Sequence, residues 1–563
     1  MTAVMAAVPE SRRGLAGGGF TVIPRWTLNP VAGIAEHEAA IPGDLAAAAR
    51  QLAAELAMPL RSMLLAAHAK VLAALSGEHE VATGYVAAAG GRPLPCRLST
   101  EPRSWRALLR EAHQAEEELL SDQDFPADDL MCEPGPAFET VFDPARFDPA
   151  GSGPPGDEGT VLWVGFSHHG GGLRLRLWYR TEVLDAAGAV RIAGYYHRAL
   201  ALIITDPDAE HSRQSLLSAE ELRFQLVGLA GARRKLPDRR FHELFEQRVA
   251  AHPDAIAAVH GERRWTYREL NARANRLGRV LLARGLRREG VVAVLTERNL
   301  NWMASVIAIF KAGGVYLPIE PGFPADRIAR TLSRAGCELV LTERGSTSTL
   351  DAALGGLPGV EAVFIDDAYR EDHPVGDLGV AVAADQLAYI YFTSGSTGEP
   401  KGAMCEHAGM LNHLYAKIED LEIGEGHVVA QIAPQCFDIS LWQLISALLT
   451  GGRTLIIGQE VILDAASFAE TIITGRVAVL QVVPSYLEVF LSYLERHPRE
   501  LPDLRYVSVT GEAVKRELIQ RWFAAQPGIR LLNAYGLTET SDDTNHEVMD
   551  RAPEGDRVPL GPC

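Results

Sequence analysis

The pattern of hydrophobic and polar positions differs between the first and second parts of this chain. Between positions 42 and 230, segments with helical apolar spacing, such as Met58–Leu75, mix with strand-like alternation, and Val161–Tyr179 predicts a β-hairpin around a glycine-rich turn. After Phe241, short apolar runs such as Val291–Leu295 alternate with helical segments. This alternation predicts a largely parallel sheet covered by helices, in which ligands bind in the loops at the carboxyl ends of the strands.

A basic, proline-containing segment separates the parts of the chain that have these two patterns. It reads GARRKLPDRR and occupies positions 231–240, a composition typical of a linker. Little periodicity precedes Pro42. We therefore predict a flexible tail over 1–41, a first α/β domain over 42–230, a linker over 231–240 and a second α/β domain over 241–563.

Composition and charge exclude several classes of function. The 563 residues carry a formal net charge of −18, which argues against a general nucleic-acid binder because nothing offsets phosphate repulsion. The 6 cysteines are scattered and form no CxxC pair, so we expect neither a disulfide framework nor a zinc cluster. No apolar run is long enough to span a bilayer. The expected location is the cytoplasm, with no membrane partner.

The most informative segment is YIYFTSGSTGEPKG at positions 389–402. An apolar strand leads into a loop of glycines and hydroxyl side chains, followed by Lys401. Glycines let backbone N–H groups approach a polyphosphate, hydroxyls add donors and the lysine adds charge. The spacing is not that of a Walker loop. A surface turn rich in Ser and Gly is the alternative, and the full TSGSTGxPKG pattern favours phosphate binding.

Four further motifs accompany this loop in a fixed order. They are WTYREL at 265–270, FKAGGVYLPIEP at 310–321, FDIS at 437–440 and NAYGLTET at 533–540. With them, residues 241–563 resemble the adenylate-forming enzymes, and among these the amino-acid-activating domains of nonribosomal peptide synthetases. The implied fold is the amino-terminal core of those enzymes, with parallel sheets covered by helices plus a small β region.

The resemblance also implies roles at the nucleotide. ATP phosphates would be held by Lys401 and the loop residues Thr393, Ser394, Gly395, Ser396, Thr397 and Gly398. The adenine pocket would be lined by Asn533, Ala534 and Tyr535, with Gly511 and Glu512 beside the nucleotide. Thr538 would touch phosphate, and Glu539 would bind Mg²⁺, a cation that prefers carboxylate and phosphate oxygens. Lys401, Thr538 and Glu539 are thus the expected catalytic residues.

The same resemblance places an amino-acid pocket. Asp438 of FDIS would bind the α-ammonium of the substrate; on its own it would be expected to cap a helix. The remaining pocket positions would be Ile439, Trp442, Gln481, Ser508, Thr510, Ala534, Asp542 and Asp543. Because a buried carboxylate is costly without a partner, the two aspartates predict a cationic substrate. A guanidino amino acid, arginine or capreomycidine, is favoured as the substrate, and ornithine and lysine are the next candidates.

Two alternatives bear on these aspartates. They lie in SDDTNHE, which could be a solvated loop. Adjacent residues on a regular element also do not normally share a face, so on that ground only one of them is expected to reach the pocket.

Residues 42–230 resemble the second half of a condensation domain, which implies an α/β half-condensation fold. The likeness lies in MLLAAHAKVLAAL at 63–75, PAFETVFDPARF at 136–147 and IITDPDAE at 203–210. The catalytic HHxxxDG motif of such domains is absent, since His168-His169 is followed by Gly-Gly-Gly-Leu-Arg and fits a hairpin turn. We therefore predict a truncated, catalytically silent domain that packs on the adenylation core.

The resemblance finally implies what the complete system needs. The family's ribose-binding aspartate, its small carboxyl-terminal domain with a catalytic lysine, and a carrier domain bearing phosphopantetheine have no counterpart in the 563 residues. The expected partners are an amino acid, a peptidyl carrier domain and a small accessory protein, and turnover is expected to be slow or absent. An acyl- or aryl-CoA ligase of the same fold and a non-catalytic scaffold are the competing interpretations; Asp438 opposes the first, and the phosphate loop with Glu539 opposes the second.

Overall fold

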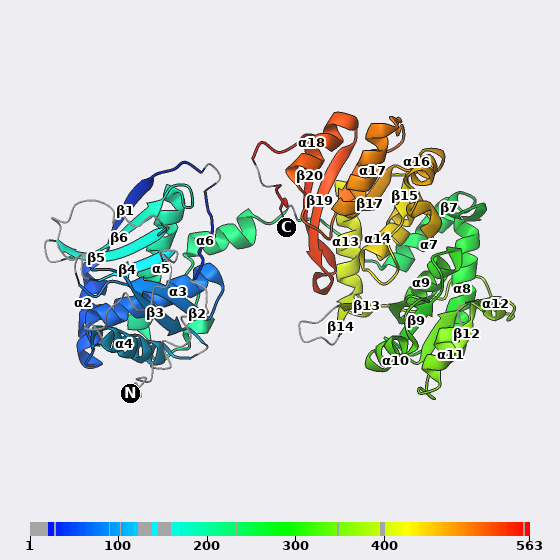
Figure 1. Cartoon of the computed structure of the whole chain (residues 1–563). Coiled ribbons are helices and arrows are strands. Elements are labelled where there is room, and N and C mark those ends of the chain that lie inside the picture. Colours follow the sequence, from blue (N-terminus) through cyan, green and yellow to red (C-terminus); the bar gives the residue numbers. More distant parts are fainter. Residues whose placement is uncertain are drawn as a thin grey trace, which may run out of the picture. The chain divides into compact units, whose positions relative to one another are not determined.

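The computed structural model describes residues 21–562, apart from 28–29, 89–90, 102, 122–137, 145–158, 170–171, 232, 346–347, 394–399 and 556–557. The chain separates into two compact units, Met1–Gly228 and Leu229–Cys563 (Figure 1). This division lies next to the basic segment at 231–240, while the roles predicted for the two parts remain predictions.

The first unit is built on a six-stranded sheet in the order β1-β6-β5-β4-β2-β3. β4 runs parallel to β2 and β5, and the other neighbours are antiparallel. The strands are β1 Ile34–Ala40, β2 Glu80–Tyr85, β3 Leu94–Ser99, β4 Thr140–Asp143, β5 Leu162–His169 and β6 Gly172–Arg180. The helices are α2 Gly43–Glu55, α3 Leu60–Ser76, α4 Trp105–Ser121, α5 Ala186–Thr205, η2 His211–Arg213, α6 Ala219–Arg223 and η3 Phe224–Gly228.

The segments of this unit that were predicted as a helix and a hairpin form those elements, and the prediction for the amino-terminal tail needs a correction. Helix α3 ends at Gly77, whose φ of 77° suits a residue without a Cβ, and β5 and β6 form the predicted hairpin. The prediction of a flexible tail over 1–41 is wrong for Ile34–Ala40, which pairs with β6 as an edge strand. Its IAEHEAA sequence alternates in exposure, a weak signal over seven residues. The motif at 136–147 lies partly outside the described residues.

The second unit contains two sheets. One has six strands in the order β12-β11-β9-β10-β13-β14, parallel except for the β13–β14 pair. Its strands are β9 Val291–Leu295, β10 Val315–Ile319, β11 Leu339–Thr342, β12 Glu361–Phe364, β13 Leu387–Thr393 and β14 Lys401–Glu406. Helices along the same stretch are α8 Tyr267–Ala283, α9 Leu300–Lys311, α10 Ala325–Arg334, α11 Ser348–Leu354 and α12 Ile365–Ala368.

The other sheet has eight strands in the order β20-β19-β18-β17-β15-β16-β7-β8, parallel from β19 to β7 and antiparallel at both ends. Its strands are β7 Ile256–His260, β8 Arg263–Thr266, β15 Val428–Gln431, β16 Arg453–Ile456, β17 Val479–Val482, β18 Tyr506–Val509, β19 Arg530–Leu537 and β20 Asp542–Met549. The remaining helices are α7 Phe241–Ala251, α13 His407–Asp420, α14 Ile439–Ile445, η4 Ser446–Leu449, α15 Gln459–Ile462, α16 Ala465–Thr474, α17 Pro484–Arg496, α18 Arg516–Ala525 and η5 Thr538–Thr540. The predicted mixed α/β fold with parallel sheets covered by helices is therefore confirmed.

One continuous core joins the two sheets of the second unit. Helix α9 is buried along its whole length and packs in a cluster with α8, α13 and strands of both sheets. Helix α13 contacts β13, β14, α14 and β20 (Figure 1), which carry the ends of the phosphate loop, part of FDIS and the two predicted aspartates. The fold thus brings residues far apart in sequence to the same helix.

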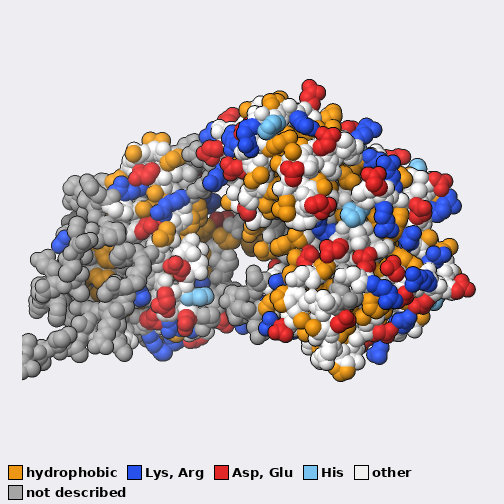
Figure 2. Space-filling view, turned by 45° about the vertical axis from the view of Figure 1, so that its right-hand side comes forward, with side chains coloured by type: hydrophobic (Ala, Val, Ile, Leu, Met, Phe, Trp, Pro, Cys, Tyr) orange, Lys and Arg blue, Asp and Glu red, His pale blue; other side chains and the backbone are white. Residues whose placement is uncertain are grey.

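The visible surface of the second unit is mixed in character. Acidic and basic side chains are interspersed with hydrophobic ones over the face of the second unit shown in Figure 2. Among the described residues, no single helix is both long and apolar enough to cross a membrane, and one bent pair, Gly43–Glu55 with Leu60–Ser76, meets the criteria of length and composition. The cysteines that the structure describes, at positions 96, 337, 405 and 436, are free thiols.

Candidate active site

The predicted phosphate loop connects two paired strands. Thr393 ends β13 and Lys401 begins β14, and the two residues lie opposite each other in the antiparallel register. The Thr393 hydroxyl donates to the Lys401 carbonyl at 3.4 Å, and the Lys401 side chain is exposed. The loop residues Ser394, Gly395, Ser396, Thr397 and Gly398 lie outside the described residues. Both ends of the loop are thus positioned by the sheet.

The predicted nucleotide residues follow the carboxyl ends of neighbouring parallel strands. On β19, Asn533 is buried and donates to the Pro559 carbonyl at 2.8 Å, whereas the ring of Tyr535 is 49% exposed. After β18, Glu512 accepts hydrogen bonds from the backbone N–H and hydroxyl of Ser485 at 3.0 and 2.9 Å. This is the edge at which ligands of parallel sheets bind.

A bulge between β19 and β20 brings the two predicted aspartates inward together. A Cβ on Gly536 would lie 2.2 Å from the Asp542 carbonyl oxygen, so only glycine permits this close approach. The pairing register shifts beside it, and Asp542 has a φ of +88°. The side chains of Asp542 and Asp543 are only 6% and 1% exposed. The expectation that adjacent residues on a strand face opposite ways is therefore wrong here.

Asp438 combines the two roles considered for it. It stands at the N-cap of α14, where its carboxylate accepts a hydrogen bond from the Ile439 backbone at 2.9 Å. A hydrogen bond from the Thr538 side chain also reaches this carboxylate. Burial nevertheless raises the pKa of Asp438 above its ordinary value, and Asp543 adds to this rise. A cation bound nearby would therefore stabilise the ionised form of the Asp438 carboxyl group.

The carboxylate of Asp543 has a partner that sequence reasoning missed. The Nζ atom of Lys417, on α13, lies 2.6 Å from its Oδ2 atom, and Thr510 donates to its Oδ1 atom at 3.3 Å. The Lys417 side chain is 0% exposed; its Nζ atom lies 3.5 Å from the Ser508 hydroxyl and 4.9 Å from the centre of the Trp442 ring. The argument that this carboxylate lacks a partner in the protein is therefore wrong.

Two histidines complete the surroundings of Asp543. The Nε2 atoms of His413 and His546 each lie 3.6 Å from its Oδ2 atom. Burial lowers the pKa of His413 to about 4, so this imidazole is neutral at physiological pH. Although burial by itself raises the pKa of Asp543, Lys417 and the two imidazoles hold that pKa well below its usual range. We call Lys417, His413, His546, Asp542 and Asp543 the buried polar cluster.

Asp542 is the contrasting member of this cluster. Its Oδ2 atom lies 3.6 Å from Nδ1 of the neutral His413. Burial raises the pKa of Asp542 well above its ordinary value, and the charges of Asp543 and Asp438 raise it further. Lys417 opposes this rise without overcoming it. The carboxyl group of Asp542 thus lacks the compensation that Asp543 receives.

The remaining predicted positions surround the same group of elements. Gln481 on β17 is paired in register with Ser508 on β18, and both side chains are buried. Ala534 is buried on β19, and Ile439 packs against the core next to Trp442. Both polar atoms of the Gln481 amide lack a hydrogen-bond partner. Glu539, on the short helix η5, is exposed.

A sequence signal for the missed residues existed on α13. The buried face of this helix contains Met410, Leu411 and Leu414, and also His413 and Lys417, four positions apart. Polar residues at core positions of an amphipathic helix need partners inside the fold. That pattern indicates a buried polar contact, although the partner on β20 is more than 120 residues away in the sequence and could not be named from it.

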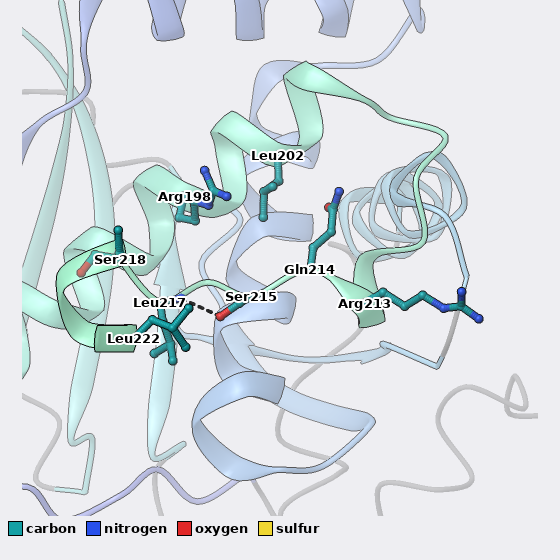
Figure 3. Close-up of a pocket in the computed structure, with 9 residues that line it drawn as sticks. Arg198, Leu202, Arg213, Gln214, Ser215, Leu217, Ser218 and Leu222 are labelled. Carbon is teal, nitrogen blue, oxygen red and sulfur yellow. Dashed lines mark hydrogen bonds between the residues drawn. The ribbon is translucent and has the colours of Figure 1, made fainter. Parts of the chain in front are cut away.

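A pocket also lies in the first unit, in a different part of the chain. It is lined by α5, the following segment and α6, including Arg198, Leu202, Gln214, Ser218 and Leu222 (Figure 3). Arg213 at its edge is 82% exposed and pairs with Glu210. None of the motif residues lines it, so the candidate active site remains the one in the second unit.

Comparison with known proteins agrees with this placement. The family model described as AMP-binding enzyme matches residues 245–562. Tyrocidine synthase 3 of Brevibacillus parabrevis is 28% identical over 556 residues, which are 91% of this chain and 8% of that protein. Malpinin synthetase of Mortierella alpina is 30% identical over 545 residues, 90% of this chain and 7% of that protein. The chain thus spans only a small part of these relatives.

Solved structures show the same fold. The AMPPNP-bound form of the nonribosomal peptide synthetase FmoA3 aligns with a TM-score of 0.76 at 22% identity, covering 96% of this chain and 61% of that chain. The N-terminal subdomain of Klebsiella oxytoca NpsA aligns with a TM-score of 0.51 at 26% identity, covering 58% of this chain and 80% of that chain. The chain belongs to the AMP-binding enzyme family, and its relatives support an adenylation domain of the nonribosomal peptide synthetase type.

Proposed function

We propose that this chain uses ATP to activate a cationic amino acid as its aminoacyl-adenylate for nonribosomal peptide synthesis. The observation that carries the substrate class is the charge balance around Asp438. The carboxyl groups of Asp438, Asp542 and Asp543 are largely buried and act on one another electrostatically. Among the described residues, the ammonium group of Lys417 pairs with one of them, Asp543. An α-ammonium at Asp438 and a side-chain cation at Asp542 would compensate the other two.

A guanidino amino acid, arginine or capreomycidine, suits this arrangement best. A guanidinium is planar, always charged and can hold a carboxylate through two hydrogen bonds. The unpartnered amide of Gln481 offers a further acceptor close to Ser508. Ornithine and lysine are the alternatives, because an ammonium group also carries the charge but forms no planar fork. A neutral substrate would leave Asp542 without compensation.

The chemical step needs mainly positioning and charge neutralisation. A carboxylate oxygen of the amino acid attacks the α-phosphorus of ATP, the bond from that phosphorus to the pyrophosphate oxygen breaks, and pyrophosphate leaves. In our proposal, Asp438, positioned by Thr538, holds the α-ammonium and so aims the carboxylate. Lys401 with the loop 393–398 would bind the phosphates, and Asn533, Ala534, Tyr535, Gly511 and Glu512 would surround the nucleoside.

Glu539 would hold Mg²⁺, and its exposed carboxylate fits a hard cation that retains several waters. When bound, Mg²⁺ would neutralise charge on the phosphate oxygens. The thiol of phosphopantetheine on a peptidyl carrier domain would then attack the aminoacyl carbonyl, so that a thioester forms, the bond to phosphate breaks and AMP leaves. A small accessory protein is a further proposed partner. For the first unit we propose a silent half-condensation domain.

Calorimetric titration tests the substrate class directly. The chain, with Mg²⁺ and a non-hydrolysable ATP analogue, is titrated with arginine, a cyclic guanidino analogue, ornithine and phenylalanine. We expect guanidino amino acids to bind most tightly, and Asp542→Asn to weaken them by about tenfold or more. Because Asp542 has a raised pKa, a bound cation should also displace its proton, which appears as a dependence of the heat on the buffer.

Asp438→Asn should weaken every amino acid and leave nucleotide binding intact. A preference for phenylalanine, or nucleotide binding without any amino acid, contradicts the proposed substrate. The second of these results would favour a non-catalytic scaffold or an acyl-CoA ligase of the same fold.

A further inference from the structure

Lys417 occupies a position that none of the sequence motifs contains. It lies on the buried face of α13, and its side chain is 0% exposed. Its ammonium group lies 2.6 Å from the Asp543 carboxylate and faces the ring of Trp442 at 4.9 Å. Both Asp543 and Trp442 are predicted substrate-contacting positions, so this lysine reaches the amino-acid site from outside the motifs.

The other neighbours of Asp543 also belong to the protein. Thr510 donates to one oxygen, and the imidazoles of His413 and His546 lie 3.6 Å from the other. His546 is held in turn by Asp420, whose Oδ2 atom is 2.7 Å from its Nδ1 atom. The carboxylate of Asp543 is therefore surrounded by an internal cation and polar groups. A substrate cation would have to displace Lys417 in order to reach it.

The neighbouring carboxyl group has no such partner. Asp542 contacts His413, whose neutral imidazole adds no positive charge. Its backbone is held at a φ of +88° by the bulge at Gly536, a conformation that an L-residue adopts only when the surrounding structure enforces it. Two adjacent aspartates therefore differ in their surroundings because Lys417, on another element, pairs with only one of them.

We propose that Lys417 is a specificity-determining residue. Its ammonium group pairs with the Asp543 carboxylate, so that only the Asp542 carboxylate is available to bind a cationic group on the substrate side chain. This inference rests on the proposed function of the same site. Lys417 of α13 would determine how many carboxylates are available to the substrate side chain. With the lysine the site suits one side-chain cation, and without it the site would present two carboxylates.

The same atoms allow a competing interpretation as a metal site. One ligand atom each of His413, Asp543 and His546 lies within 4.8 Å of the other two, and two histidines with one carboxylate are ligands that Zn²⁺ accepts. The hydrogen bond that Nδ1 of His546 donates to the Asp420 carboxylate is also of the kind that orients metal-binding histidines. However, the Lys417 ammonium lies next to the carboxylate oxygen that would bind the metal. Lys417 is thus the cation of this cluster.

The test compares the binding of arginine with that of citrulline, its uncharged isostere, by calorimetry on the full chain with Mg²⁺ and a non-hydrolysable ATP analogue. The quantity measured is the ratio of the two affinities. Lys417→Met should raise the arginine preference by about tenfold or more, because Asp543 becomes available to the substrate. Asp543→Asn should lower the preference by a similar factor, because an unpaired ammonium then repels the cation.

The double variant Lys417→Met/Asp543→Asn removes both charges and should return the ratio to within about threefold of the wild type, since the pair is neutral as a whole. If Lys417→Met alone fails to fold, the ratio can still be compared between the wild type, Asp543→Asn and this double variant. The matched control is Lys311→Met, which removes another fully buried lysine, paired with Glu246 and Asp377 away from the site. It should leave the ratio unchanged.

The outcomes separate this inference from the proposed function. A wild type that prefers arginine, with the preference unaltered in both single variants, overturns the role of Lys417 and leaves the proposed function standing. A wild type without a preference contradicts the cationic substrate, whereas a preference that then emerges in Lys417→Met supports the role of the lysine. Tight binding of Zn²⁺ that competes with arginine overturns the assignment of Lys417 as the cation of the cluster.

Discussion

The ion pair between Lys417 and Asp543 should make a large, measurable contribution to stability. The two side chains are 0% and 1% exposed, and the charged atoms lie 2.6 Å apart. Two unit charges at this distance attract by about 6 kcal/mol at an effective dielectric constant of about 20. Lys417→Met removes this attraction and leaves a buried carboxylate, so we expect a loss of about 3–5 kcal/mol in the free energy of unfolding near neutral pH.

The loss should depend on pH in a defined direction. In the wild type the pKa of Asp543 is depressed, so its stabilising effect is present above the unfolded pKa and stays constant across neutral pH. In Lys417→Met, burial without the ammonium should raise that pKa, and the folded state then binds a proton that the unfolded state does not. The deficit of the variant should therefore shrink as the pH falls from about 8 to about 5.5.

Urea unfolding at these pH values, followed by tryptophan fluorescence, measures the effect on the transition of the second unit. The matched control is Arg476→Met, which removes an ion pair with Asp503 whose arginine is 70% exposed; it should change stability little, because solvent screens such pairs. The double variant Lys417→Met/Asp543→Asn should recover most of the loss. A single variant as stable as the wild type, with the same pH dependence, would refute the buried ion pair.

Three further predictions concern other parts of the structure. Gly536→Ala should destabilise the second unit by about 1–3 kcal/mol in thermal unfolding and weaken arginine binding, because the new Cβ collides with backbone that cannot move away. Asn299→Ala should cost about 1 kcal/mol, since it removes the cap that accepts from two backbone N–H groups of α9; an unchanged unfolding midpoint would contradict the cap. Stability should fall as the pH decreases from about 6.5 towards 4, by about 1.4 kcal/mol per pH unit for each buried histidine, because the unfolded chain binds protons that the folded chain excludes. The histidines whose pKa burial lowers to about 3 or 4 in this way include His68, His242, His407 and His413, and a flat pH profile would show that they titrate normally.

Much of the fold could be predicted from local pattern. The run Val291–Leu295 formed a strand with the bounds of the predicted apolar run, because apolar, β-branched segments between helices have few alternatives in a parallel sheet. The strand at Ile34–Ala40 was missed because an edge strand leaves half of its residues exposed and carries little hydrophobic signal.

The candidate site could be predicted only where a contiguous motif marks it. Asp438 was predicted from its place in FDIS, and Trp442 and the two aspartates of β20 from their spacing after FDIS and NAYGLTET. The fold brings Trp442 and the two aspartates close to Lys417 of α13. Lys417 and His413 were missed because their partners lie across the tertiary structure. The orientation of Asp542 and Asp543 was missed because it depends on a bulge and a left-handed backbone angle, which alternation rules do not predict.

The most direct test of the central claim is to identify the adenylate that this chain forms. The chain is incubated with Mg²⁺, ATP and an equimolar mixture of amino acids that includes the guanidino candidates, and the acyl-AMP bound to the protein is identified by mass spectrometry after a single turnover. We expect the adenylate of a cationic amino acid, with a guanidino compound in excess over ornithine and lysine. The adenylate of a neutral amino acid or of an acid without an α-amino group would contradict it.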